Sequence, residues 1–379
     1  MKRIGVLTSS RADYGIYLPL LRKIESSQDF KLSMIVFGTH LSPFHGMSAD
    51  LIRVDGFSID YQINSMLLHD DENAIATASS LTMLKFSDFW QNHADDFDLV
   101  FCLGDRYEMF GAVYAGIPYG IKFAHIHGGE TTAGAIDNIY RHAISQASSL
   151  HFTSTENYKE KVNQITDSKD IFVTGALSLD NLRNVKLYSL LEMKNNFGID
   201  FSESTILITV HPETVASERN VNFAHICYEV FYQLAEKYQL VITMPNADTL
   251  GSVFRNEFIK LKNDVKKNII LVENFGTQGY FSAMHYSKFL IGNTSSGIIE
   301  AASFRKYVIN LGDRQLGRLS GDNVKHSPFN VKSILENVAI IESKGEFTGD
   351  NPYDLKGASE KICQILADYF IKLNSSLKN

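Results

Sequence analysis

Residues 292–301 read GNTSSGIIEA, and this stretch decides the fold prediction. It follows Phe289-Leu290-Ile291, an apolar run that predicts a short buried strand, and it opens a segment rich in helix-forming residues at 298–303. A strand, a Gly/Ser/Thr turn and a helix in this order present unpaired backbone N–H groups and the positive end of a helix dipole. Such a turn suits a phosphate or diphosphate, to which Ser295 and Ser296 add hydroxyl donors. The alternative is an ordinary serine N-cap on a helix that packs against a sheet.

Glu300 extends this interpretation. It lies four residues after Ser296, so both side chains are expected on one helix face, one turn apart. A carboxylate there suits a diol such as a ribose rather than the phosphate itself. The stretch therefore predicts a ligand with a nucleoside diphosphate.

The composition of the chain limits the class of protein to which it can belong. With 379 residues and 44% hydrophobic content, the chain can form two domains with large cores. A formal net charge of −7 argues against a general nucleic-acid or membrane-surface binder. The three cysteines are scattered without metal-ligand spacing, which favours a reducing, cytoplasmic setting. The apolar run at residues 4–7 is too short for a signal peptide, and no stretch approaches bilayer-spanning length, so we expect a soluble protein.

Short apolar runs alternate with helical patterns along the whole chain, which is typical of parallel sheets covered on both faces. A polar stretch at 184–203 separates two series of runs and is interpreted as the domain connection, and residues 357–373 predict an amphipathic helix. We therefore expect an α/β protein with two Rossmann-like domains that face each other across a cleft. The predicted strands are residues 4–7, 32–36, 99–103, 122–126, 150–152 and 171–173 in the first series, and 206–210, 240–242, 269–272, 289–291 and 307–309 in the second.

Polar clusters follow several of these strands, at the sheet edge where ligands bind in open α/β folds. Arg11 follows the first strand and can reach a phosphate, although a solvated loop arginine is the alternative. Asp105 follows Gly104 after the strand at 99–103, either as a functional carboxylate or as a helix N-cap.

His125 and His127 lie two residues apart, so on a strand they would share one face and could bind a metal. No third ligand is evident nearby, so we expect no metal. The following glycine pair lets the backbone approach a ligand closely, with Glu130 beside it. Asp137 and Arg141 stand one turn apart at a predicted helix start, where a surface ion pair is the alternative.

His211 closes the strand at 206–210 and is expected to point into the cleft toward Ser295 and Ser296. Asp105, Glu130 and Asp137 end strands or begin helices in one domain, and the predicted anion site belongs to the other. Carboxylates and an anion site suit proton abstraction beside a phosphate leaving group.

The motifs together resemble the UDP-N-acetylglucosamine 2-epimerase family, in particular its hydrolysing branch that feeds sialic-acid-type sugars. The resemblance runs from residue 1 to about residue 330, and residues 274–280 match no motif of the family. The motifs that carry it occur in this order: Arg11, the loop from His40 to Pro43, Gly104-Asp105-Arg106, His127-Gly128-Gly129-Glu130, Asp137, Arg141-His142, His211-Pro212-Glu213-Thr214, residues 292–297, and Gly312-Asp313-Arg314-Gln315.

The resemblance implies a glycosyltransferase-B-like fold in which the C-terminal helix packs back on the first domain. The implied boundaries are 1–183 for the domain with the carboxylates, 184–356 for the UDP-binding domain and 357–379 for the returning helix. It also implies a nucleotide-sugar substrate, a homodimer, and no cofactor. The implied catalytic residues are Asp105, Glu130, Asp137 and His211. The implied substrate-binding residues are Arg11, His40, Arg106, Arg141, Asn293, Ser295, Ser296, Gly297, Glu300 and Arg314.

The implied reaction converts UDP-N-acetylglucosamine and water to N-acetylmannosamine and UDP, by elimination through 2-acetamidoglucal and then hydration. The alternative substrate is a UDP- or GDP-linked 2,4-diacetamido-2,4,6-trideoxyhexose. A sugar transferase of the same fold would need an acceptor pocket, and the three carboxylates speak against it. Gly312-Asp313-Arg314-Gln315 and the loop at residues 9–13 favour the hydrolysing over the non-hydrolysing branch. A catalytically dead sugar sensor would keep the serine turn and lose the acids, which this chain retains.

Overall fold

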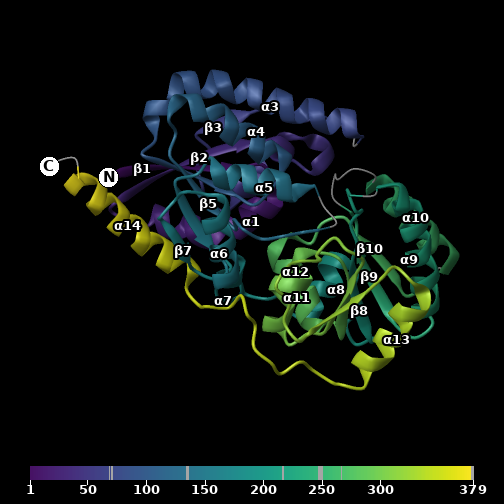
Figure 1. Ribbon diagram of the computed structural model, residues 1–379. Helices are drawn as coiled ribbons and strands as arrows, with labels where there is room; N and C mark the ends of the chain where they lie inside the picture. Colours follow the sequence, from purple (N-terminus) through teal and green to yellow (C-terminus); the bar gives the residue numbers. More distant parts are fainter. Residues whose placement is uncertain are drawn as a thin grey trace. The chain divides into compact units, whose positions relative to one another are not determined.

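A computed structural model describes residues 1–67, 69, 71–133, 136–215, 217–245, 251–265 and 267–376 of the chain. The chain forms two compact units. Unit 1 comprises Met1–Glu130, Asp137–Asn184 and Tyr353–Asn379, and unit 2 comprises Thr131–Ile136 and Val185–Pro352. Each unit holds one parallel sheet flanked by helices (Figure 1). The predicted α/β class with two parallel sheets is confirmed.

The sheet of unit 1 has seven strands in the order β3-β2-β1-β4-β5-β6-β7, and every neighbouring pair is parallel. The strands are β1 (Lys2–Thr8), β2 (Phe30–Phe37), β3 (Tyr61–Ile63), β4 (Leu99–Leu103), β5 (Phe123–Ile126), β6 (Leu150–Thr153) and β7 (Ile171–Val173). The helices are α1 (Arg11–Glu25), α2 (Ala49–Val54), α3 (Glu72–His93), α4 (Tyr107–Gly116), α5 (Asp137–Gln146), α6 (Glu156–Ile165), α7 (Ser178–Asn184) and α14 (Ala358–Ser376).

Successive side chains along a strand point to opposite faces of the sheet, so alternate residues belong to two different hydrophobic cores. Ile4 and Val6 of β1 belong to the core beneath α1 and α14. Leu7 belongs to the opposite core, with Trp90 of α3 and Met109 of α4. Burial on both faces explains why these strands read as continuous apolar runs.

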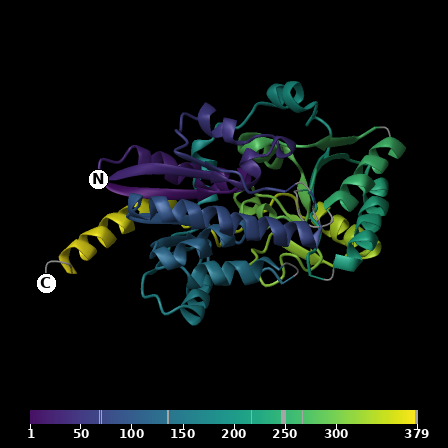
Figure 2. The same cartoon turned by 90° about the horizontal axis from the view of Figure 1, so that it is seen from above.

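The last helix completes unit 1. Figure 2 shows this helix, in yellow, at the side of the sheet where the chain begins. Ile362, Leu366 and Phe370 of α14 are buried in the same core as β1 and α1. The Lys2 ammonium lies 5.2 Å from the centre of the Phe370 ring, so the end of the chain packs near its start. Asp180 of α7 accepts hydrogen bonds from the Ala358 and Ser359 amides at the first turn of α14. The predicted return of the C-terminal helix to the first domain is therefore confirmed.

The sheet of unit 2 has six strands in the order β10-β9-β8-β11-β12-β13, again all parallel. The strands are β8 (Thr205–Thr209), β9 (Gln239–Thr243), β10 (Ile269–Val272), β11 (Phe289–Gly292), β12 (Val308–Leu311) and β13 (Val324–Ser327). The helices are α8 (Leu190–Phe197), α9 (Asn220–Leu234), α10 (Gly251–Val265), α11 (Gly276–Tyr286), α12 (Ser295–Ile299) and α13 (Val331–Glu342). Single 3-10 turns in the two units occupy Gly38–Leu41, Pro43–His45, Ala94–Asp96, Ile117–Tyr119, Ser217–Arg219 and Ala301–Phe304.

Three local expectations differ from the structure. The sequence pattern predicts a loop at Arg11, but this residue is the first of α1, which Ser10 caps by accepting from the Asp13 amide at 3.3 Å. The helix expected at 298–303 already begins at Ser295, so both serines lie in its first turn. The polar stretch at 184–203 is not only a connection, because it contains α8 with a capping box at Ser189.

No helix in the described part of the chain is both long and apolar enough to cross a membrane.

Candidate active site

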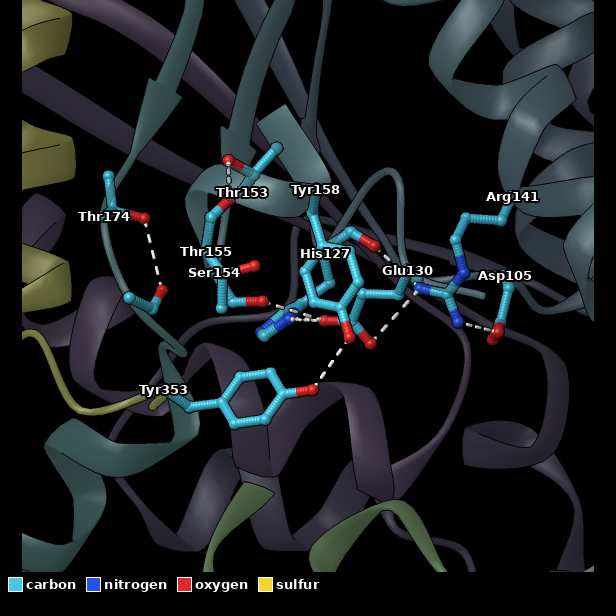
Figure 3. A network of polar contacts seen from close by, with 12 residues as sticks. Asp105, His127, Glu130, Arg141, Thr153, Ser154, Thr155, Tyr158, Thr174 and Tyr353 are labelled. Atoms are coloured by element: carbon cyan, nitrogen blue, oxygen red, sulfur yellow. Dashed lines mark hydrogen bonds and ion pairs between the residues drawn. The ribbon is translucent and has the colours of Figure 1, made fainter. Parts of the chain in front are cut away.

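A buried guanidinium joins two carboxylates in unit 1 (Figure 3). Asp105 follows β4 and Glu130 follows the adjacent strand β5, so both stand at the carboxyl edge of the sheet. Arg141 of α5 donates from Nη2 to Asp105, and its Nη1 lies 3.9 Å from Glu130 Oε2. The Arg141 and Glu130 side chains are 2% and 1% exposed, whereas Asp105 is 23% exposed. Asp105 is therefore the more accessible of the two carboxylates.

The turn after β5 holds Glu130 from two sides. His127 Nδ1 lies 2.7 Å from Glu130 Oε1, and the Ser154 hydroxyl donates to the same oxygen at 3.2 Å. His127 has a left-handed backbone with φ 63°, which a non-glycine residue rarely adopts. Gly129 also has a left-handed φ, and a Cβ there would stand 2.4 Å from the Tyr158 carbonyl oxygen, so only glycine fits.

His125 and His127 do not share a strand face, because the chain turns at His127. The His125 ring instead lies between the Gly104 carbonyl and the Ser145 hydroxyl, at 2.9 Å from each. Burial lowers the pKa of His125 to about 3, so the ring is neutral at physiological pH. Among the residues that the structure describes, no group of three or more His, Cys, Asp or Glu side chains could hold a metal ion.

Asp137 begins α5 as predicted and is half-buried. One helical turn separates it from Arg141, so the helix that carries the guanidinium also carries the third candidate carboxylate.

A second polar group surrounds the end of β1 in unit 1. Asp13 is buried and accepts from the Ser9 amide and hydroxyl at 3.1 and 2.7 Å. Burial raises the pKa of Asp13, and the charge of nearby Arg106 opposes that rise. Arg106 forms two hydrogen bonds with the buried carboxylate of Glu108, at 3.1 and 2.9 Å.

His40 lies beside this group on the turn Gly38–Leu41, and its ring is fixed at both nitrogens. Nε2 lies 2.8 Å from Thr8 Oγ1, and Nδ1 lies 2.8 Å from Ser48 Oγ. Burial, and then the charge of Arg11, lower the pKa of His40 to about 3. A neutral His40 thus anchors the loop near Arg11.

In unit 2, Asn293 joins the ends of two neighbouring strands. Its side-chain oxygen accepts from the His211 amide at 2.7 Å, and its side-chain nitrogen donates to the His211 carbonyl at 2.8 Å. The Asn293 carbonyl accepts from Arg314 Nη1 at 3.3 Å and from Gln315 Nε2 at 2.9 Å. These bonds bring His211, Asn293 and Arg314 together beside the start of the serine turn.

The start of α12 follows directly. Gly292 has φ 149°, and a Cβ there would meet the Thr209 carbonyl oxygen at 1.8 Å, so glycine allows β11 to approach β8. Glu300 donates its amide to the Ser296 carbonyl at 3.0 Å, which confirms the predicted one-turn spacing of these residues. The Tyr280 hydroxyl lies 3.3 Å from Thr209 Oγ1. Burial, and to a lesser degree the nearby Glu300 carboxylate, raise the pKa of Tyr280 to about 12.

The structure thus forms two sets of predicted residues, one in each unit. Unit 1 holds Arg11, His40, Asp105, Arg106, Glu130, Asp137 and Arg141, and unit 2 holds His211, Asn293, Ser295, Ser296, Gly297, Glu300 and Arg314. The sequence pattern did not single out Ser154 or Tyr280. It indicated Asp13 only as part of the loop at residues 9–13, and His127 only as a possible metal ligand and as part of the family motif that ends at Glu130. The spacing of His127 and Glu130 was the available signal, but its meaning depends on the left-handed turn.

The chain is similar to known proteins along nearly its whole length. The sequence model of the family described as UDP-N-acetylglucosamine 2-epimerase matches residues 22–367. The chain belongs to the UDP-N-acetylglucosamine 2-epimerase family.

Individual relatives cover nearly the whole chain. A UDP-N,N'-diacetylbacillosamine 2-epimerase (hydrolyzing) from Legionella pneumophila is 31% identical over 100% of this chain and 98% of its own. A polysialic acid biosynthesis protein P7 from Escherichia coli is 29% identical over 100% and 97%. A GDP/UDP-N,N'-diacetylbacillosamine 2-epimerase (hydrolyzing) from Campylobacter jejuni is 33% identical over 87% and 85%.

A solved structure shares the fold. The crystal structure of UDP-GlcNAc 2-epimerase from Neisseria meningitidis bound to UDP-GlcNAc aligns with a TM-score of 0.80 over 97% of this chain and 100% of that one, at 20% identity. The glycosyltransferase-B-like epimerase fold is therefore confirmed. As a member of this family, the chain is an enzyme, a nucleotide-sugar 2-epimerase of the hydrolysing kind.

Proposed function

We propose that this epimerase converts UDP-N-acetylglucosamine and water to N-acetylmannosamine and UDP. A base removes the H2 proton of the sugar while the C1–O bond to UDP breaks, which gives 2-acetamidoglucal. Water then adds its oxygen to C1. A proton is delivered to C2 on the face opposite to the one from which H2 was removed, and the free 2-epimer leaves. Each half of the reaction needs its own proton transfers.

The Asp105–Arg141–Glu130 cluster is the observation that carries this proposal. H2 is a weak acid, so a carboxylate that removes it must be held in a dry, preorganised site. Arg141 offsets part of the negative charge of Asp105 and Glu130 and holds the buried Glu130 carboxylate away from water, which is the arrangement such a site requires. Asp137 supplies a third carboxylate on the helix of Arg141. We assign proton transfer at carbon and at water to these three acids.

The groups of unit 2 suit the leaving group. Backbone N–H groups at the start of α12, with Ser295 and Ser296, offer donors to a diphosphate. Arg314, fixed by the Asn293 carbonyl, adds a positive charge, and His211 is assigned to stabilise or protonate the departing phosphate. Glu300 is assigned to the ribose hydroxyls.

The second candidate substrate is a UDP- or GDP-linked 2,4-diacetamido-2,4,6-trideoxyhexose. It is favoured by the two relatives at 31% and 33% identity, which are named for diacetylbacillosamine. The chemistry at C1 and C2 would be the same, and the substituents at C4 and C6 would differ. Proton NMR of the reaction with each nucleotide sugar distinguishes them, since only the true substrate will yield a free 2-epimer at a useful rate.

Isotope labelling tests the reaction itself. In heavy water we expect one solvent deuterium at C2 of the released sugar, because the proton lost on elimination is replaced during hydration. In oxygen-18 water we expect label at C1 of the sugar and none in UDP, because the C–O bond breaks. Protium retained at C2, or label in the UDP phosphate, would contradict the proposal and indicate simple phosphate hydrolysis.

A further inference from the structure

We propose that His127 is a positioning residue that both holds Glu130 and restores its protonation state between turnovers. The proposal rests on the proposed function, which gives Glu130 a proton to transfer. Besides its hydrogen bond to Glu130, the His127 ring then serves as the path along which that proton moves.

The contacts of His127 place it between the two charged partners of the site. Its Nδ1 lies 2.7 Å from Glu130 Oε1, and its backbone carbonyl accepts from Arg141 Nη1 at 2.7 Å. Ser154 donates to the same Glu130 oxygen, so the carboxyl group is fixed against the imidazole (Figure 3). One residue therefore sets the position of both the acid and the guanidinium.

Because Glu130 is buried, its proton needs a path to solvent. A carboxyl group that gives or takes one proton in each turnover ends that turnover in the wrong state and must exchange a proton before the next. Glu130 is 1% exposed, so it has almost no surface through which bulk water can exchange that proton directly. His127 is an ionisable group whose Nδ1 lies at hydrogen-bond distance from a Glu130 carboxyl oxygen.

The second ring nitrogen completes the path. His127 Nε2 is buried and has no hydrogen-bond partner among the described residues. Buried polar atoms are nearly always satisfied in folded proteins, so an open nitrogen here points to an exchangeable water or ligand proton. When Glu130 passes its proton to Nδ1, Nε2 releases its own, and the reverse transfer recharges Glu130. One proton enters at one ring nitrogen and one leaves at the other, so the ring holds the same number of protons before and after each exchange.

The backbone of His127 limits which variants are informative. Its φ of 63° suits glycine and asparagine better than other residues. His127→Asn keeps a nitrogen donor near the Nδ1 position and lacks the second ring nitrogen. His127→Gly keeps the backbone geometry and leaves a hole the size of an imidazole. The two variants separate holding Glu130 from exchanging its proton.

Rapid-quench kinetics of His127→Asn test the proposal. We expect the first turnover to release about one UDP per site at nearly the wild-type rate, followed by a steady state that is about 10²-fold slower, because only the reset is lost. A steady state at the wild-type rate would overturn the proposal. Equal slowing of the first and later turnovers would also overturn it, since that result indicates a purely structural role.

Chemical rescue provides the second measurement. We expect imidazole in the buffer to restore steady-state turnover to His127→Gly, with a rate that varies with the pKa of substituted imidazoles of similar size. Pyrazole, a ring of nearly the same size and a far weaker base, should not rescue. Absence of imidazole rescue in a folded variant, or equal rescue by both rings, would contradict proton exchange.

His93→Asn is the matched control. His93 Nδ1 lies 2.8 Å from Asp96 Oδ2, also three residues along the chain, but at the end of α3 outside the site. This variant should show neither a fast first turnover followed by a slow steady state nor any increase in rate with imidazole. Failure of the proposed function would look different, because the wild-type enzyme itself would then release no UDP from the nucleotide sugar.

Discussion

Asp105 and Glu130 share one guanidinium but differ in their surroundings. Glu130 is enclosed by His127, Ser154 and Arg141, whereas Asp105 keeps about a quarter of its side-chain surface open. Carboxylates in different environments can hold protons at different points of a reaction, which is how one site performs both acid and base chemistry. The two residues therefore should not be interchangeable.

The three carboxylate variants test this difference. Asp105→Asn, Glu130→Gln and Asp137→Asn keep the shape of each side chain and remove its proton transfer, which typically costs about 10²–10⁴ in rate. A variant that blocks only hydration should still release UDP and 2-acetamidoglucal slowly, and one that blocks H2 removal should release neither. Supplying 2-acetamidoglucal with UDP separates the two kinds, with product followed by NMR. Near wild-type turnover in all three would remove the catalytic assignment.

Buried histidines make unit 1 sensitive to acid. Burial lowers the pKa of His40 and His125 to about 3 and that of His151 to about 4. An unfolded chain has histidines near pKa 6.5, so only the unfolded state gains these protons as the pH falls below that value. The contribution of each histidine to the free energy of unfolding is complete above about pH 6.5. It is lost as the pH falls from there to about 4 for His151 and to about 3 for His40 and His125, by up to about 1.4 kcal/mol per pH unit for each histidine.

Urea unfolding of the full chain at pH 7, 6 and 5 measures this loss. His151→Asn should flatten the pH dependence by about one histidine's share, because the amide does not titrate in this range. A free energy of unfolding that stays constant from pH 7 to pH 5 would contradict the prediction, as would the same slope in wild type and variant.

Single residues also mark what the sequence could not predict at the site. Asp105, Glu130 and Asp137 stand out because they follow predicted strands or begin a predicted helix at the sheet edge where ligands bind, although Asp105 and Asp137 also have structural alternatives as a helix N-cap and a surface ion pair. The role of His127 depends on its left-handed backbone, and a non-glycine residue in the sequence does not predict that conformation. Ser154 reaches Glu130 from the turn after β6, 24 residues along the chain, and no local spacing indicates that contact.

At the scale of elements, the central strands were predictable and two of the four edge strands were not. Central strands such as β4 are buried on both faces, so a continuous apolar run identifies them. The two strands that the sequence missed, β3 and β13, are edge strands. They read Tyr-Gln-Ile and Val-Lys-His-Ser, and their mixture of polar and apolar residues reflects partial exposure. Burial, rather than strand propensity, was the signal.

Asn293 is the element-scale test in unit 2, because it ties the end of β8 to the end of β11. Asn293→Ala removes both hydrogen bonds to the His211 backbone and leaves two buried groups unsatisfied, which costs about 1–3 kcal/mol each. We expect a lower melting temperature and weaker UDP inhibition, since His211 and the serine turn lose their common anchor. Asn293→Asp keeps the acceptor for the His211 amide but places a buried carboxylate oxygen against the His211 carbonyl, so it should destabilise at least as much as Asn293→Ala. Wild-type stability in Asn293→Ala, measured by calorimetry, would argue against this role.

At the scale of the whole molecule, each unit has a sheet and cores of its own, so stability and ligand binding can be assigned separately. Leu366 of α14 is fully buried in unit 1, and Phe231 of α9 is fully buried in unit 2. Replacing either with alanine should cost about 2–5 kcal/mol in its own unit. Hydrogen exchange followed by mass spectrometry should show faster exchange in the altered unit alone. Equal loosening of both units would show that they unfold as one.

UDP should act on one unit in the same experiment. The diphosphate is assigned to the start of α12, so UDP at about 100 times its dissociation constant should stabilise the unit that binds it by about 2.7 kcal/mol. We expect slower exchange in peptides from β8, β11 and α12, and a much smaller change in β1 and β2 of unit 1. A folded Ser295→Ala/Ser296→Ala variant should lose most of this protection at the same UDP concentration, because hydroxyl donors to a charged phosphate contribute more than neutral hydrogen bonds. Protection confined to unit 1, or retained in full by the double variant, would remove the diphosphate from α12 while leaving the carboxylate cluster in place.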